Sequence, residues 1–197
     1  NPIEIVQLIE GKSNLQPRNV GNGQLAGVEV EVRQSLSRIH QTLKNLAFNA
    51  NFTYTESQID IASNELRTRQ QSLREGKELD ETRPMTRQAP YVVNGGFAYQ
   101  NPEMGLSVGT YYNVKGKTLY FVGVGDLPDV YQEPFHNLKL NATYSFGEED
   151  RYSLSFEAEN LLNDDREKFF EAYRAQDRPF SRLSPGRSFS LSFGVNF

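Results

Sequence analysis

The last ten residues of the chain, SFSLSFGVNF, alternate without exception between apolar residues and residues that are small or polar. Phe189, Leu191, Phe193, Val195 and Phe197 take every second position, and Ser, Gly and Asn fill the positions between them. Successive side chains of a β-strand point to opposite faces of a sheet, so this period of two predicts a strand with one apolar and one polar face. Such a strand belongs in a sheet that separates an apolar environment from a wet one.

The same alternation recurs along the rest of the chain. It is found in residues 25–32, 46–55, 91–100, 106–114, 138–146 and 152–159, and residues 2–9 form a less regular eighth segment. One alternating strand is typical of any antiparallel sheet with one solvated face, whereas seven in succession favour a continuous two-faced wall. The sequence therefore predicts an all-β fold of about eight antiparallel strands.

The connections between these segments alternate in length. Short connections at 37–44, 101–104 and 147–150 are interleaved with long, polar ones at 10–24, 57–90, 115–134 and 161–187. Transmembrane β-barrels join their strands through short turns on one side of the membrane and longer loops on the other. We therefore expect a transmembrane β-barrel, with a short helix in connection 57–90 that stops near Gly76.

Aromatic residues on the apolar face fall into two bands. Tyr99, Tyr144, Phe146, Tyr152 and Phe197 lie near the short connections, whereas Tyr54, Tyr91 and Tyr112 lie toward the long ones. Transmembrane barrels carry such girdles at both membrane interfaces, where a tyrosine ring is apolar and its hydroxyl stays wet. We predict that Tyr99, Tyr144 and Tyr152 belong to an interfacial girdle.

Charged residues of both signs occupy the polar face of the predicted strands. They are Glu29, Glu31, Arg33, Lys139, Glu157 and Glu159. In a barrel this face lines the interior, so we expect these side chains to point into the lumen. Two interpretations stay open, a generic solvated wall and a role in binding a solute.

Composition and motifs exclude several classes of function. The net charge of −4 removes the phosphate attraction on which nucleic-acid binding relies, and the absence of cysteine excludes disulfides and thiolate metal sites. No apolar run reaches the roughly 18 residues of a transmembrane helix. The first ten residues have no signal-peptide pattern, so we interpret them as an internal segment of a longer protein.

Catalytic and metal-binding patterns give no support for an enzyme. His40 and His136 stand alone, without a cysteine or a nucleophile motif near them. The carboxylates of NDDRE (163–167) lack the ligand spacing of an EF-hand loop, so we interpret them as polar loop residues. We predict no enzymatic activity, no metal and no cofactor.

Several stretches, read in order, resemble the outer-membrane receptors that depend on TonB. NVGNGQLAGVEVEVRQSL is similar to a segment of these receptors in which a glycine precedes a strand with alternating glutamates, here Gly27, Glu29 and Glu31. EAENLLNDD is similar to their NLxN element, at Asn160, Leu161, Leu162 and Asn163, and SPGRSFSLSFGVNF to their PGR entry into the last strand, at Pro185, Gly186 and Arg187. ELDETRPMTRQAPYVVNGGFAYQ and GTYYNVKGKTLYFVGVGDLPDVYQEP are similar to the receptors of Bacteroidota in particular.

The resemblance covers essentially residues 1–197 and implies the C-terminal part of a receptor barrel. Such receptors have about 22 strands and a plug domain that couples transport to TonB, so this chain corresponds to about the last 8 strands, without the plug. The closing strand implies that Phe193, Val195 and Phe197 are part of the signal that the barrel-assembly machinery reads. The expected partners are outer-membrane lipid, the remaining strands and plug, TonB through the plug, the assembly machinery and a surface lipoprotein.

The function implied by the resemblance is energised uptake across the outer membrane of a solute such as an iron chelate, a vitamin, a glycan or a peptide. The main alternative is a structural or adhesive barrel that displays its loops without transporting anything. A weaker alternative is a soluble β-sandwich that binds a ligand.

Overall fold

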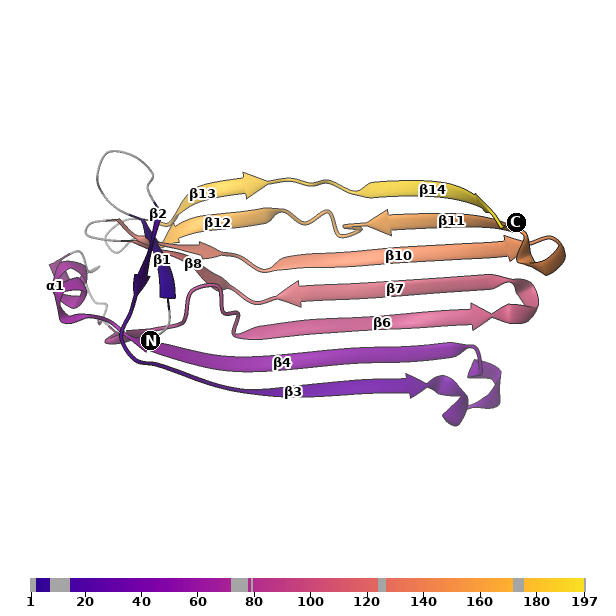
Figure 1. The fold of residues 1–197 in the computed structure, drawn as a ribbon, viewed down its shortest axis with the longest axis horizontal. Coiled ribbons are helices and arrows are strands. Elements are labelled where there is room, and N and C mark those ends of the chain that lie inside the picture. Colours follow the sequence, from indigo (N-terminus) through magenta and orange to yellow (C-terminus); the bar gives the residue numbers. More distant parts are fainter. Residues whose placement is uncertain are drawn as a thin grey trace.

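The computed structural model of the protein describes residues 3–7, 15–71, 78, 80–123, 127–171 and 176–196. Its strands form two sheets, and nearly all of them pair antiparallel. A long sheet runs the length of the molecule, and a second sheet lies at the end where the long connections gather (Figure 1). The predicted all-β, antiparallel fold is confirmed.

The long sheet, called the wall sheet below, contains the seven alternating segments in the order β3-β4-β6-β7-β10-β11-β14. Their bounds are β3 Gly23–Ser35, β4 Leu46–Asp60, β6 Tyr91–Asn101, β7 Leu106–Lys115, β10 Phe135–Phe146, β11 Tyr152–Glu159 and β14 Ser188–Val195. A two-residue strand, β5 Thr82–Arg83, pairs with the end of β4. β3 and β14 form the two edges of the wall sheet.

The short connections are tight turns at one end of the wall sheet (Figure 1). They contain the 3₁₀ turns η1 Leu36–Arg38, η2 Gln41–Leu43, η3 Pro102–Met104 and η4 Glu148–Asp150. After η3 the chain turns at Gly105 with a φ of 64°, and a Cβ there would lie 2.1 Å from the carbonyl oxygen of Ser145. Only glycine fits this turn, which holds β6 against β7.

The long connections were expected to be polar loops, but they contain a second sheet, called the loop-side sheet. Its strands are β1 Ile3–Gln7, β2 Leu15–Asn19, β8 Thr118–Gly123, β9 Asp129–Gln132, β12 Arg166–Glu171 and β13 Arg178–Leu183, in the order β13-β12-β9-β8-β1-β2. β12 and β13 lie in line with β11 and β14 (Figure 1). The wall strands are therefore extended beyond the predicted membrane zone by further paired strands.

Residues 2–9 were expected to be an eighth wall strand, and the structure places them elsewhere. β1 pairs antiparallel with β2 and parallel with β8, in the loop-side sheet. The physical reason is its burial, because Val6 packs against Leu119 and Val122 in the core of this region, and Glu4 is only 1% exposed. A strand that is buried in this way cannot face lipid on one side and a wet lumen on the other.

The helix predicted within residues 57–90 is present as α1 Ser63–Gln71. Its expected stop, Gly76, lies outside the described residues. Among the described residues, no helix has both the length and the apolar character that crossing a membrane requires.

Candidate functional site: the two faces of the wall sheet and the loop-side charge cluster

The apolar residues of the wall sheet face one another in register across its strands. Val30 lies opposite Phe52, Phe52 opposite Val93, and Val93 opposite Val114. Directly opposed residues point to the same face of a sheet, so the apolar positions form one continuous surface. Along β3 and β4 these side chains are exposed, to 52% at Val30 and 44% at Phe52, whereas Val114, at the end of β7 next to the loop-side sheet, is buried. An exposed apolar surface of this extent marks contact with a membrane or another protein.

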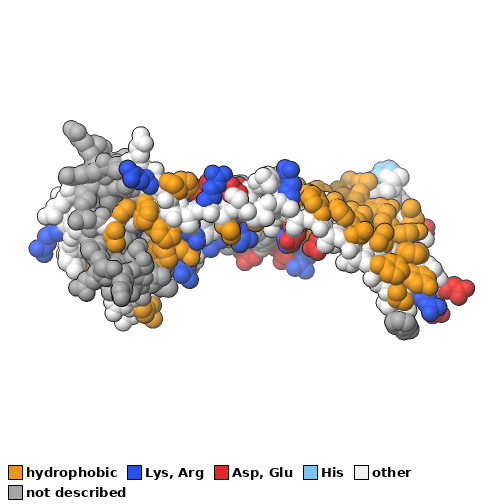
Figure 2. Space-filling view, turned by 90° about the horizontal axis from the view of Figure 1, so that it is seen from above, with side chains coloured by type: hydrophobic (Ala, Val, Ile, Leu, Met, Phe, Trp, Pro, Cys, Tyr) orange, Lys and Arg blue, Asp and Glu red, His pale blue; other side chains and the backbone are white. Residues whose placement is uncertain are grey.

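The same surface is apolar at the β14 edge. Leu154 of β11 lies opposite Phe193, which is 61% exposed. Figure 2 shows hydrophobic side chains gathered toward the end of the sheet that holds the short connections. Phe193 and Val195, two of the three residues predicted for the assembly signal, lie on this face, and Phe197 lies outside the described residues. Their role in assembly stays a prediction.

Two of the predicted girdle tyrosines belong to a chain of aromatic rings near the short connections. The ring centroids of Tyr144 and Phe146 lie 5.5 Å apart, those of Phe146 and Tyr152 5.6 Å, and those of Tyr152 and Phe193 6.0 Å. The third tyrosine, Tyr99, lies apart from this chain on β6, where its hydroxyl accepts a hydrogen bond from the Asn101 side chain at 3.2 Å. These contacts hold amphipathic rings at one level of the wall sheet.

The second aromatic band lies near the start of the long connections. Tyr54 and Tyr91 are directly opposite each other on β4 and β6. The hydroxyl of Tyr112 lies 2.6 Å from Nδ1 of His136, the second residue of β10. The other histidine, His40, caps η2, where its Nδ1 accepts from the N–H of Thr42. Both histidines thus have local structural contacts.

The polar face carries the six charged residues that were predicted to face the lumen, and the structure brings several of them together. Lys139 forms an ion pair with Glu159 across β10 and β11. Arg33 pairs with Glu31 on the same strand at 2.6 Å. Glu157 lies between Asn141 of β10 and Ser190 of β14. The glutamate Glu29 joins a different arrangement, described next. That this face lines a lumen stays a prediction.

A row of amide side chains crosses four wall strands on the polar face. The Asn113 side chain donates to Oδ1 of Asn94 at 2.6 Å, Asn94 donates to Asn51 at 3.5 Å, and Asn51 donates to the Glu29 carboxylate. Each asparagine stands at a polar position of its strand, but only the register shows that the positions align. This row links the polar faces of β3, β4, β6 and β7 in one register.

Two motifs that carried the family resemblance meet at the top of β11. The Asn160 side chain donates to the carbonyl oxygens of Asp164 at 3.0 Å and Gly186 at 2.9 Å, and its Oδ1 accepts from the N–H of Asp164 at 3.1 Å. Nε of Arg187 donates to the carbonyl of Leu161 at 2.9 Å. The NLxN segment is therefore bonded to the PGR segment, and this fixes where β14 begins beside β11.

Beyond the second aromatic band, six charged residues form a loop-side charge cluster. Its members are Glu4, Arg18, Glu65, Arg69, Arg83 and Asp129, which come from β1, β2, α1, β5 and β9. The guanidinium of Arg69 donates two hydrogen bonds of 2.9 Å to the two carboxylate oxygens of Asp129. Arg83 binds Glu4 and, at 2.6 Å, Glu65. Three arginines balance three carboxylates, as burial requires.

Burial and pairing shift the pKa values in this cluster in different directions. Burial alone would raise the pKa of Glu65, but the guanidinium groups of Arg83, Arg69 and Arg18 outweigh it and hold this pKa below its usual value of 4.5. Burial opposes charge on Arg83 as well, yet its carboxylate partners raise its pKa. For Asp129, burial is the dominant effect and raises the pKa. The cluster thus connects β1, β2, α1, β5 and β9, which are far apart in the sequence, through largely buried ion pairs.

A cavity of about 200 Å³ adjoins the charge cluster. Arg69, Arg83 and Asp129 line it together with Asp80 and Glu171. Beside it, Lys117 forms ion pairs with Glu133, at 3.1 Å, and Glu171, and lies 5.2 Å from the ring centroid of Tyr131. In the described part of the chain, no group of three or more His, Cys, Asp or Glu residues could hold a metal ion.

Sequence reasoning missed the charge cluster and the loop-side sheet. Arg83 and Glu4 are 79 positions apart, and Arg69 and Asp129 are 60 apart. No periodic pattern links residues at such separations. The one sequence feature that could have indicated the cluster was the number of charged residues in the long connections, which had been interpreted as solvated loops.

Comparison with known proteins identifies the family of the chain. A family model described as TonB dependent receptor-like, beta-barrel matches residues 4–161. Searches of curated proteins and of solved structures gave no match. The matched range includes β3 to β11 of the wall sheet and all six residues of the loop-side charge cluster. The chain therefore belongs to the TonB-dependent receptor-like β-barrel family, an outer-membrane family of transporters rather than enzymes.

Proposed function

We propose that this chain is the C-terminal part of the barrel of an outer-membrane TonB-dependent transporter, and that residues 1–197 act as one unit within it. The observation that carries the proposal is the register of the wall sheet, which places every alternating segment with its apolar residues on one face and its polar residues on the other. A wall with these two faces separates lipid from an aqueous interior.

The polar face then lines the barrel interior. Glu29, Glu31, Arg33, Lys139, Glu157 and Glu159 hydrate this interior and face the plug domain. The edge strands β3 and β14 offer unpaired backbone groups, which the remaining strands of the receptor satisfy. Energy for transport reaches the receptor from TonB through the plug.

Two further partners belong to this proposal. The apolar face of β14, with Phe193, Val195 and the terminal Phe197, is recognised by the barrel-assembly machinery. The loop-side sheet, which has six paired strands, is the surface that a partner lipoprotein binds. The solute belongs to one of four classes, namely an iron chelate, a vitamin, a glycan or a peptide.

Energised uptake is the test of the proposal. Cells that produce the complete receptor would be given a labelled iron chelate, cobalamin, an oligosaccharide and an oligopeptide, with and without a protonophore. Transport predicts that at least one solute accumulates, and that the protonophore or loss of TonB stops accumulation without stopping surface binding.

The alternative is a scaffold or adhesive barrel, and the folded loop-side sheet is the observation in its favour. That alternative predicts binding to surfaces or proteins without accumulation of any solute. Accumulation that persists after TonB is removed would contradict both proposals.

A further inference from the structure

Tyr111 is an aromatic residue on the polar face of the wall sheet. It lies directly opposite Gly96 on β6 and Lys139 on β10, and Lys139 is one of the charged residues of that face. Its neighbour Tyr112 lies opposite Leu138 and points to the apolar face. The side chain of Tyr111 is 43% exposed. The ring therefore faces the interior that the proposed function assigns to the barrel.

The ring of Tyr111 lies along the sheet, over two glycines. A Cβ built on Gly96 would lie 2.9 Å from Cδ1 of Tyr111, and a Cβ built on Gly109 would lie 2.8 Å from its Cε2. These two carbons stand at opposite corners of the ring, so one ring spans both glycines, which are buried. A ring held in this way turns its free face toward the interior.

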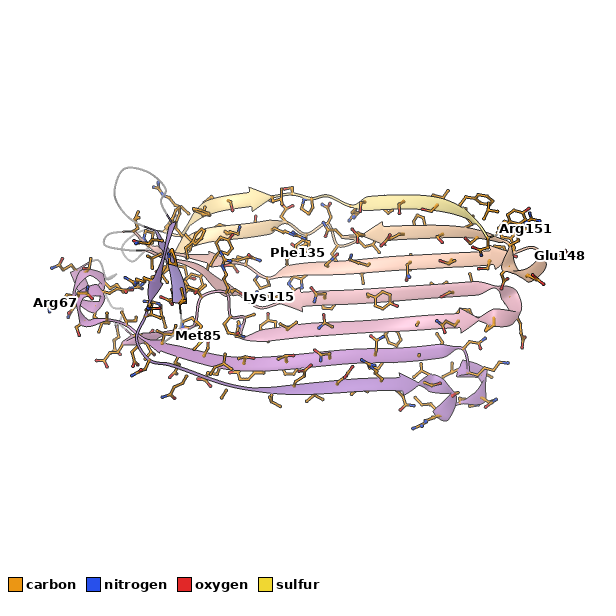
Figure 3. The ribbon with its side chains drawn as sticks, viewed as in Figure 1. Arg67, Met85, Lys115, Phe135, Glu148 and Arg151 are labelled. Carbon is orange, nitrogen blue, oxygen red and sulfur yellow. The ribbon has the colours of Figure 1, made fainter. Side chains whose placement is uncertain are left out.

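Among the described residues, no other aromatic ring and no cation lies against Tyr111, and its hydroxyl has no hydrogen-bond partner. Phe135 is the other aromatic residue on the polar face of the described wall strands, and Arg166 lies 4.7 Å from the centroid of its ring. Lys115 and Phe135, labelled in Figure 3, pair two steps closer to the long connections than Tyr111 and Lys139. Tyr111 is thus the open aromatic ring of this face.

Two asparagine side chains border the ring. Oδ1 of Asn49, on β4, would lie 3.1 Å from a Cβ on Gly96, and Oδ1 of Asn141, on β10, stands in the same way beside Gly109. Both asparagines are exposed, and within the described ranges neither side chain forms a hydrogen bond. Each amide offers two N–H donors and a carbonyl acceptor. The ring is therefore flanked on both sides by groups that can bind hydroxyls.

A hollow of about 530 Å³ adjoins this arrangement on the polar face. Its lining residues include Asn49, Asn51, Asn94 and Glu31, which all belong to the polar face of β3, β4 and β6. Sites for small solutes are commonly hollows of about 300 to 1,000 Å³ with a few well-placed polar groups. A solute stacked on Tyr111 thus has room to extend along these strands.

The charges of the polar face favour a neutral solute. With Lys115 added to the six charged residues named above, the described wall strands carry four carboxylates and three cations on this face. Lys139, beside the ring, is neutralised by Glu159. The face therefore has no excess of positive charge to attract an anionic iron chelate. A peptide pairs with an open strand edge, but β7 is the central strand of the wall sheet.

We propose that Tyr111 stacks against a pyranose ring of a neutral oligosaccharide, and that Asn49 and Asn141 hydrogen-bond the hydroxyls of this sugar. The face of an aromatic ring is electronegative and attracts the C–H groups that cover one side of a pyranose. The hydroxyls project from the edge of the sugar, where amide donors and acceptors bind them. The inference selects the glycan among the four solute classes. It rests on the proposed function, because the polar face must line an interior that solutes enter.

The test is oligosaccharide binding by the complete receptor in neutral detergent. The probe is an array of short, neutral glucans, mannans, galactans and xylans, and calorimetry then measures the affinity of the best binder. Tyr111→Leu still covers both glycines but offers no aromatic face, whereas Tyr111→Phe keeps that face. Tyr112→Leu is the matched control, because Tyr112 is the next residue of β7 and points to the apolar face.

The proposal predicts that Tyr111→Leu binds the oligosaccharide about tenfold more weakly than wild type, the factor that corresponds to the strongest ring-stacking contacts. Tyr111→Phe and Tyr112→Leu keep affinities close to that of wild type. Absence of binding to the whole array, or equal affinity of Tyr111→Leu and wild type, overturns the proposal. Equal losses in Tyr111→Leu and Tyr112→Leu also overturn it, because the loss would then come from a disturbed strand.

A second variant covers the case in which Tyr111→Leu does not fold. Asn141→Ala removes one of the bordering amides and should weaken binding about threefold to tenfold, as expected for the loss of a hydrogen bond. Unchanged affinity in Asn141→Ala then overturns the proposal. A ferric chelate or an oligopeptide whose binding depends on Tyr111 overturns the assignment to a sugar.

The uptake assay separates this inference from the proposed function. If another solute accumulates in a TonB-dependent way and no oligosaccharide binds, the proposed function stands and only the present inference fails. If an oligosaccharide binds through Tyr111 but no solute accumulates, energised transport fails and the sugar site stands.

Discussion

The Asn160 side chain donates a hydrogen bond of 2.9 Å to the carbonyl oxygen of Gly186, a residue 26 positions later. Asn160 is 5% exposed and has a φ of 50°, a region of backbone space that asparagine tolerates better than other non-glycine residues. One side chain thus closes the turn after β11 and holds the start of β14, so the two motifs of this region work as one structural unit.

Replacing Asn160 is expected to destabilise the end of the barrel. Asn160→Ala removes two donated bonds and one accepted bond and places alanine at positive φ, which should lower the free energy of unfolding by about 2 to 4 kcal/mol. Chemical unfolding of the complete receptor measures this. Asn163→Ala is the matched control, because Asn163 has a φ of 57° but an exposed side chain. Equal losses in the two variants would show that backbone strain, and not the side-chain bonds, accounts for the effect.

Removing one charged side chain of the loop-side charge cluster should lower the stability of this region. Arg83→Met leaves Glu4 charged at 1% exposure and is expected to destabilise the loop-side region by about 3 to 5 kcal/mol. Hydrogen exchange of β1 and α1 amides reports this locally. The double variant Glu4→Gln, Arg83→Met should recover a large part of the loss, because no buried charge is left unpaired. A double variant as unstable as the sum of its single variants would contradict direct coupling.

An exposed ion pair is the control for that experiment. Arg182 pairs with Asp165 at 2.5 Å, but its side chain is 64% exposed. Arg182→Met should therefore leave exchange in β1 and α1 unchanged, since exposed pairs contribute little to stability.

The stability of helix α1 should depend on pH because the carboxyl group of Glu65 titrates. The pKa of Glu65 is lowered in the folded protein, so this residue adds stability above its unfolded pKa, near 4.5, and the gain is lost as the pH falls through the lowered value. Asp129 acts in the opposite direction, because burial raises its pKa. The difference between wild type and Glu65→Gln, followed by hydrogen exchange of α1 from pH 7 to 3, isolates the contribution of Glu65. Parallel profiles would contradict it.

The two faces of β14 should respond differently to charge. Leu191 is 69% exposed on the apolar face and lies between Phe189 and the aromatic chain that ends at Phe193. Leu191→Arg is expected to cost about 2 to 4 kcal/mol, the value for arginine near the middle of a bilayer. Ser190→Arg points to the polar face opposite Glu157 and should cost far less. Unfolding of both variants in lipid vesicles provides the comparison, and equal costs would contradict the assignment of faces.

The sequence was sufficient to predict the wall sheet because each strand carries its own signal. In β10, Leu138, Leu140, Ala142 and Tyr144 alternate with polar residues, and each of them lies on the predicted face. Alternation is a local property, so it needs no knowledge of which strand is the neighbour. The same reasoning placed the polar charges on one face, but the pairing of Lys139 with Glu159 became visible only with the register.

The loop-side sheet was not predictable in the same way. β8 reads TLYFVG and is buried nearly throughout, so it has no alternation, and its partner β1 lies far away in the sequence, at the start of the chain. Short apolar runs fit a buried strand or a buried helix equally well. The charge cluster depends on contacts such as Arg83 with Glu4, which exist only after five separate elements have come together.

Site-directed spin labelling along β4 of the complete receptor in a lipid bilayer tests the central claim most directly. Labels at Asn49, Ala50, Asn51, Phe52 and Thr53 would be exposed in turn to oxygen, which concentrates in lipid, and to a water-soluble nickel reagent. We predict a period of two, with oxygen reaching positions 50 and 52 and the nickel reagent reaching 49, 51 and 53. Access of the nickel reagent to all five positions, or the opposite phase, would contradict a wall that has lipid on its apolar face and water on its polar face.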